Sequence, residues 1–157
     1  MPNELKDKFS TSTALTISLD GLADGAGRQS SLVDNSASRD QDVLLFVKLR
    51  ADTAAVPDAD AVCEVYLLRG DADATGEHVS DGAGPSDAAF TPLNAPLIGV
   101  MTTSGAPSAG DVLYGEFLVH RPGPTWGVAV VNRTGQAFSS TAGDHWVRFV
   151  GLNPEVQ

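Results

Sequence analysis

Short runs in which apolar and polar residues alternate constrain the fold of this chain more than any other feature. Within residues 42–51, apolar side chains recur at every second position, and two basic side chains stand between them. The apolar set is Val43, Leu45, Val47 and Leu49, and the basic set is Lys48 and Arg50. A β-strand places successive side chains on opposite faces, so this pattern predicts a strand with one buried face.

Eight runs of this kind follow one another, separated by clusters of Gly, Pro, Asp and Ser. They are residues 13–19, 28–35, 42–51, 61–69, 96–103, 111–119, 125–132 and 145–151. No window longer than a few residues has the i, i+3, i+4, i+7 spacing of an amphipathic helix. The chain is therefore predicted to be all-β, an antiparallel β-sandwich of about eight strands with a jelly-roll-like topology. We expect one hairpin between 42–51 and 61–69 and another between 111–119 and 125–132.

The domain organisation follows from length and from two segments that lack the alternation. A length of 157 residues fits one domain, and we assign the sandwich to residues 13–157. Residues 1–12 are charged and carry little pattern, so we expect an N-terminal arm. Residues 71–95 are rich in Gly, Asp, Ala and Pro, which predicts one long loop. Loops longer than about 15 residues are usually functional or disordered, so this loop is a candidate contact surface.

The charge balance excludes some classes of partner. Acidic residues outnumber basic ones by 20 to 10, which gives a formal net charge of −10. Such a chain repels phosphate groups, so we expect it to bind neither nucleic acid nor an anionic membrane. Cys63 is the only cysteine and cannot form an intrachain disulfide. Because no run resembles a signal peptide or a membrane span, we expect a soluble protein made in a cytoplasm without Sec-type export.

Two known signals overlap in residues 69–82. Arg69-Gly70-Asp71 is a tripeptide that some cell-surface receptors bind, and the oxygens from Asp71 onward are spaced like the start of a calcium loop. An EF-hand needs a bidentate Glu at the twelfth position, where this chain has Gly82, so an EF-hand is excluded. A looser calcium site and receptor binding stay open as alternatives to a solvated strand end.

Signals for catalysis or for a metal centre are missing from the sequence. The three histidines, His78, His120 and His145, lie far apart, and the motifs HExxH and GxSxG do not occur. The carboxylates lie almost entirely in turns. We therefore expect no cofactor, no metal site and no enzymatic activity.

The two tryptophans are candidates for binding. Trp146 alternates onto the same face as Arg148, away from Val147 and Phe149. An outward Trp beside Arg is typical of an interface hot spot. Trp126 or Trp146 could instead stack on a sugar ring, and both could also pack in the core.

Six segments, taken in order, resemble a group of small structural proteins from tailed bacteriophages. They are LVDNS (32–36), VYLLRGDAD (65–73), DAAFT (87–91), PLIGVMTT (96–103), WGVAVVNRTG (126–135) and GDHWVRFVGLNP (143–154). The resemblance covers most of the chain from about Thr13 onward. It implies a β-sandwich virion protein and, within that group, a capsid decoration or cement protein that stabilises the head. Its partner would be the major capsid protein, and such proteins commonly act as trimers on the outer shell after assembly in the host cytoplasm.

We expect contacts from the arm, the long loop and the outward face of the last strand. The residues chosen are Leu5, Phe9, His78, Phe90, Trp146 and Arg148. Two other functions stay open at this point. One is a phage tail component, such as a baseplate or collar subunit. The other is a carbohydrate-binding module that reads sugars through Trp126 or Trp146.

Overall fold

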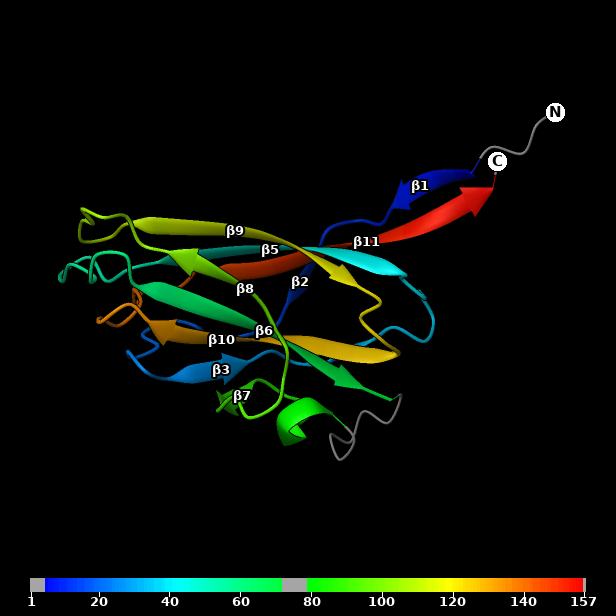
Figure 1. The fold of residues 1–157 in the computed structure, drawn as a ribbon, viewed down its shortest axis with the longest axis horizontal. Helices are drawn as coiled ribbons and strands as arrows, with labels where there is room; N and C mark the ends of the chain where they lie inside the picture. Colours follow the sequence, from blue (N-terminus) through cyan, green and yellow to red (C-terminus); the bar gives the residue numbers. More distant parts are fainter. Residues whose placement is uncertain (1–4, 72–78, 157) are drawn as a thin grey trace.

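Two antiparallel sheets that lie face to face make up the fold (Figure 1). The computed structural model describes residues 5–71 and 79–156, and within them it has eleven strands and one 3-10 turn, η1 (Ser80–Gly82). Sheet A consists of β1 (Leu5–Phe9), β2 (Thr13–Leu15), β5 (Asp42–Arg50), β9 (Val112–His120) and β11 (Trp146–Val156). Sheet B consists of β3 (Gly27–Gln29), β4 (Val33–Asp34), β6 (Val62–Gly70), β7 (Ala88–Phe90), β8 (Leu97–Thr102) and β10 (Thr125–Arg133). The all-β sandwich predicted from the alternation is confirmed.

Each of the eight predicted runs coincides with all or part of one strand or, for residues 28–35, with part of β3 and all of β4. Strand β11 continues furthest beyond its run, to Val156. The additional strands are β1, within the segment expected to be an arm, and β7, within the segment expected to be a loop. No helix within residues 5–71 and 79–156 is long and apolar enough to cross a membrane.

The strand order shows that the chain crosses between the sheets at most of its connections. Sheet A has the order β1-β11-β5-β9, with β2 also paired to β11, and sheet B has the order β7-β3-β10-β6-β8, with β4 also paired to β10. Both predicted hairpins are therefore wrong, because β5 and β6 lie in different sheets, and so do β9 and β10. Alternation reports which side chains face inward, but it does not report which neighbouring strand supplies the backbone hydrogen bonds.

The core between the sheets is built from the side chains that alternation predicts to face inward. In β5 the odd-numbered residues from Val43 to Leu49 are fully buried, and so are the inward residues of β6 opposite them. Trp126 of β10 is also fully buried, and its ring meets Phe149 of β11 edge to face with the centroids 4.9 Å apart. This core joins the two sheets and fixes which face of sheet A points away from it.

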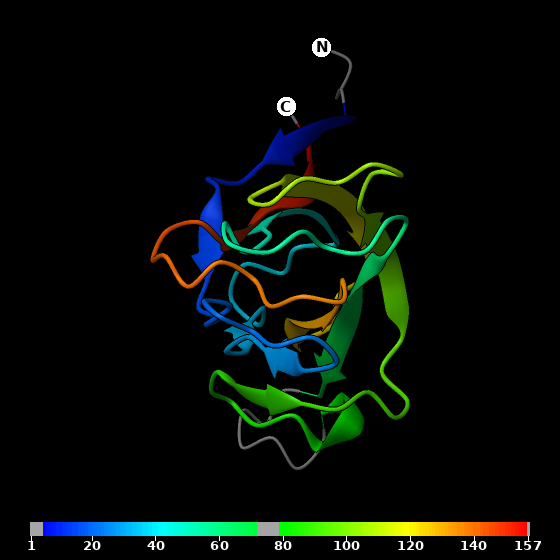
Figure 2. The ribbon, with the colours of Figure 1, turned by 90° about the vertical axis from the view of Figure 1, so that its left-hand side faces the viewer.

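A second cluster of buried side chains lies on the outer face of sheet B. Nearly all of β10 is buried on both of its faces, because residues 79–95 fold back over Ala129 and Val131. Figure 2 shows this segment at the bottom of the view, where β7 pairs with β3 as an edge strand of sheet B and η1 lies nearby. Phe90 of β7 is 7% exposed and packs beside Tyr66 with the ring centroids 5.9 Å apart. Residues 79–95, which belong to the segment predicted to be a long loop, therefore cover the outer face of sheet B and pack on it through an apolar cluster. We call these residues the cover of sheet B.

Asp81 fastens this cover. Its backbone has a left-handed φ of 58°, and its carboxylate accepts hydrogen bonds from the N–H groups of Leu93, Asn94 and Ala95 at 2.6–3.0 Å. Partial burial by itself would raise the pKa of Asp81, but the three N–H donors outweigh it and hold the pKa below its ordinary value. Burial would likewise raise the pKa of Asp87, but hydrogen bonds from Arg28 and Ser18 outweigh it, so the pKa of Asp87 is also lowered.

Acidification is expected to loosen residues 79–95 before the sandwich unfolds. A lowered native pKa means that these carboxylates stabilise the fold above the ordinary Asp pKa of about 4. That contribution is lost as the pH falls through the lowered native pKa. Hydrogen exchange at the amides of Leu93, Asn94 and Ala95, corrected for intrinsic rates, should show protection falling as the pH drops below about 4. In Asp81→Asn the protection should already be lower at pH 6, and it should vary less with pH, because only Asp87 still titrates there; an unchanged pH profile would contradict the assignment.

Candidate interaction surface

The outer face of sheet A carries apolar side chains that point away from the core. Strand β5 lies in the middle of this face, with β11 on one side and β9 on the other. Three cross-strand rows make up the face: Trp146–Lys48–Tyr114, Arg148–Phe46–Glu116 and Val150–Leu44–Leu118. A sheet with one solvated face normally shows polar residues on that side, yet six of these nine residues are apolar.

Several of these side chains are open to solvent. Tyr114 is 68% exposed and Leu118 is 52% exposed, and both belong to β9, which is an edge strand of sheet A. Leu44 and Phe46 on the central strand are half-buried by their neighbours. Contiguous exposed apolar surface on a soluble domain typically marks an interaction site.

Trp146 and Arg148 lie on this face, where the alternation of the last strand places them. The Cζ atom of Arg148 is 5.5 Å from the ring centroid of Trp146, and the Tyr114 ring centroid is 6.4 Å from it. Trp146 is half-buried and Arg148 is exposed. A guanidinium over a Trp ring in apolar surroundings is typical of protein–protein contacts. Trp126, by contrast, is enclosed in the core and cannot stack on a sugar in this fold.

A second candidate surface is the terminal ribbon, formed by β1 and by the end of β11, residues 152–156. The two strands pair antiparallel from Leu5 opposite Val156 to Phe9 opposite Leu152, and the ribbon extends beyond one end of the sandwich (Figure 1). Phe9 is 61% exposed. A two-stranded ribbon is at best marginally stable alone in water, so a projecting ribbon with an exposed Phe is suited to packing against another molecule.

The base of the terminal ribbon is held against the sandwich. Ser10 donates its backbone N–H to the Gly151 carbonyl at 2.9 Å, and the Asn153 amide donates to the Asp40 carboxylate at 2.7 Å. A cavity of about 490 Å³ opens beside it, lined by Lys8, Ser10, Ser38, Arg39, Asp40, Asn153 and Pro154. These contacts fix the direction in which the ribbon leaves the sandwich.

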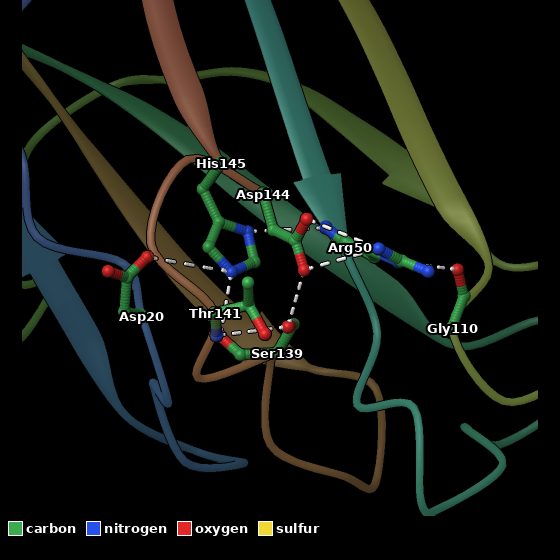
Figure 3. Close-up of polar contacts among 7 residues, drawn as sticks. All are labelled: Asp20, Arg50, Gly110, Ser139, Thr141, Asp144 and His145. Carbon is green, nitrogen blue, oxygen red and sulfur yellow. Dashed lines mark hydrogen bonds and ion pairs between the residues drawn. The ribbon is translucent and has the colours of Figure 1, made fainter.

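A polar network at the opposite end of β5 contains Ser, His and Asp side chains, the residue types of a hydrolase triad (Figure 3). The Ser139 hydroxyl donates to Asp144 at 2.6 Å, and Arg50 donates to the same carboxylate at 3.2 Å. His145 accepts the Arg50 backbone N–H on Nδ1 at 3.2 Å and donates from Nε2 to the Ser139 carbonyl at 2.9 Å. A nucleophilic Ser needs its hydroxyl on the imidazole, whereas here both imidazole nitrogens bind backbone groups. The network fastens the loop before β11 to β5.

The other side chains that could act as a nucleophile or as metal ligands are either buried or far apart from one another. Burial raises the pKa of the Cys63 thiol to about 12, so the thiol is un-ionised at neutral pH and a poor nucleophile. Among the residues that the structure describes, no three His, Cys, Asp or Glu side chains gather as metal ligands would. Arg69 and Gly70 are the last residues of β6, and the Arg69 guanidinium donates to the His120 carbonyl at 2.7 Å.

The six predicted contact residues are divided among different parts of the molecule. Trp146 and Arg148 share the outer face of sheet A, whereas Leu5 and Phe9 belong to the terminal ribbon. Phe90 belongs to the cover and is buried against sheet B, so the prediction that it is a contact residue at the surface is wrong. His78 and most of the possible calcium loop lie outside the described residues.

Sequence reasoning missed the apolar partners of Trp146 on this face. Leu44 and Phe46 occupy outward positions of β5, a face to which the sequence pattern assigns only Lys48 and Arg50. The signal was present: the run VLLFV is apolar at successive positions, which is typical of a strand with two apolar faces. Comparison of the chain with protein-family models, with curated proteins and with solved structures finds no match.

Proposed function

We propose that this chain is a structural protein of a tailed-bacteriophage virion, a capsid decoration protein that binds the major capsid protein on the outer shell and stabilises the head. The observation that carries the proposal is the terminal ribbon, which projects from the sandwich and presents Phe9 to solvent. A cement protein must reach across the junctions between shell subunits, and a rigidly based projection supplies that reach.

Two further features support a virion protein. Strands β2, β3 with β4, β5, β6, β8, β9, β10 and β11 lie in turn in sheets A, B, A, B, B, A, B and A. From this order of sheets we infer a jelly-roll-like topology, and jelly rolls are common in viral capsid domains. The net charge of −10 suits a position outside the shell, away from the packaged DNA.

Replacing the exposed aromatic of the ribbon is expected to weaken binding to the head. In the test, heads of the phage that encodes this chain, stripped of it, are mixed with the full-length protein and sedimented. Phe9→Asp should lower the affinity about tenfold or more, equivalent to about 1.4 kcal/mol, because it places a carboxylate in an apolar contact. Leu93→Asp is the matched control: Leu93 is 83% exposed but lies on the cover of sheet B, so its binding should be unchanged.

Other results would revise the proposal in distinct ways. If Phe9→Asp and a chain lacking residues 1–12 both bind heads as tightly as the native chain, the terminal ribbon is not the part that binds the capsid. Binding to isolated tails and not to heads would make the chain a tail component. Circular dichroism of each variant establishes that the fold is retained.

A further inference from the structure

The two side strands of the outer face of sheet A carry matching side chains. In each row, β11 and β9 contribute one residue on either side of the central residue from β5. In the first row both flanking residues are aromatic, in the second they are a basic and an acidic residue, and in the third both are aliphatic. They are Trp146 and Tyr114, Arg148 and Glu116, and Val150 and Leu118.

A two-fold axis that runs along β5, between two facing copies of the chain, would bring these matched residues into contact. It would place β11 of one copy over β9 of the other, with each row over its own counterpart. Arg148 would then face Glu116 of the second copy at two symmetric positions, and Phe46 would pack on its counterpart at the centre. An axis across the strands would instead set Arg148 against Arg148, so the charge pattern selects the first orientation.

The usual geometry of packed sheets preserves this match. Face-to-face sheets cross at about 30°, which displaces a side chain one strand from the axis by about 2.5 Å. Successive rows on one face are about 6.8 Å apart, so each row still meets its counterpart. Lys48 would face its own copy, and its aliphatic stem lets the ammonium group reach solvent at the end of the strand.

We propose that the outer face of sheet A binds a second copy of this chain as a two-fold dimer, with Phe46 at its centre and two Arg148–Glu116 ion pairs beside it. The nearly balanced charge of this face lets two chains approach although each carries a net charge of −10. The dimer does not depend on what the terminal ribbon binds. It also differs from the trimer that the family resemblance implies, so the two assemblies are separable by mass.

Charge reversal tests this arrangement directly. Sedimentation equilibrium of the full-length chain in about 0.15 M salt, where screening acts over about 8 Å, should show a monomer–dimer equilibrium. Arg148→Glu and Glu116→Arg should each raise the dimer Kd at least tenfold, because each sets like charges against each other twice. The double variant Arg148→Glu/Glu116→Arg should return the Kd to within a few-fold of the native value.

Mixing the two single variants gives the sharpest result. A heterodimer of Arg148→Glu with Glu116→Arg contains two opposite-charge pairs, so the mixture should associate as tightly as the native chain although neither variant does so alone. Both side chains are exposed, and thermal unfolding checks that each variant folds. Arg148→Gln and Glu116→Gln, each expected to weaken the dimer, replace any reversal that folds poorly.

The proposal would be overturned by a native chain that stays monomeric up to about 1 mM. A trimer would overturn it too, and so would a dimer that ignores both single reversals. A mixture of the single variants that fails to associate, while the native chain dimerises, would exclude the two-fold arrangement.

Discussion

Replacing Trp126 with alanine is expected to remove about 3–5 kcal/mol from the free energy of unfolding. Trp126 is fully buried, spans the core between the sheets and contacts Phe149 edge to face. Its removal leaves a cavity that neighbouring strands, fixed by their ladders, cannot close. Because small domains are stable by only about 5–15 kcal/mol, the variant should be close to unfolding at 37 °C. Urea denaturation monitored by circular dichroism measures the loss.

The second tryptophan provides the control for this prediction. Trp146 is half-buried on the outer face of sheet A, so Trp146→Ala should cost only about 1 kcal/mol. Trp126→Phe should cost less than Trp126→Ala, because it keeps the ring and removes an indole N–H that has no hydrogen-bond partner among the described residues. Equal losses for the two alanine variants would contradict the placement of Trp126 in the core and Trp146 on the surface.

Replacing Asn132 with aspartate is expected to cost about 3–5 kcal/mol at pH 7. The side chain of Asn132 is fully buried, and its amide donates to the carbonyl oxygens of Leu22 and Gln136 at 2.9 and 2.7 Å. Its carbonyl accepts from the backbone N–H and the hydroxyl of Thr134 at 3.0 and 2.8 Å. Aspartate has the same shape, but its carboxylate would face two carbonyl oxygens without a proton to donate.

The loss in Asn132→Asp should depend on pH with a defined sign. Burial against two acceptors favours the protonated acid, so the native pKa of the introduced group should exceed its unfolded value of about 4. The loss of stability relative to the native chain should therefore be smallest at pH 4 and should grow as the pH rises toward 7. Gln41→Glu makes the same chemical change at an exposed position and should alter stability by no more than about 0.5 kcal/mol. A loss in Asn132→Asp that does not vary with pH would contradict the account.

Local patterning predicted the strands and their inward faces well. Val43, Leu45, Val47 and Leu49 in β5, and Val147 and Phe149 in β11, face the core as the alternation indicates, because a period of two is a property of each strand by itself. The same pattern placed Trp146 beside Arg148 on one face. The run from Trp126 to Val131 predicts a strand, but its burial on both faces comes from residues 79–95, which the sequence predicts to be part of a loop.

The pairing of strands was decided by tertiary structure alone. Residues 42–51 and 61–69 follow each other in sequence, yet they lie in opposite sheets, because each strand pairs where its buried face can join the common core. For the same reason Phe90 is drawn under sheet B by Tyr66 and Ala129 and is not available for contacts.

What the sequence by itself determined is therefore the direction of each side chain along a strand. Only the tertiary structure decided the rows in which Trp146 meets Tyr114 and Arg148 shares a line with Glu116. Those rows join strands that are tens of residues apart in the chain. The physical reason is that alternation arises from backbone geometry within a few residues, whereas register and sheet membership arise from the packing of the whole core.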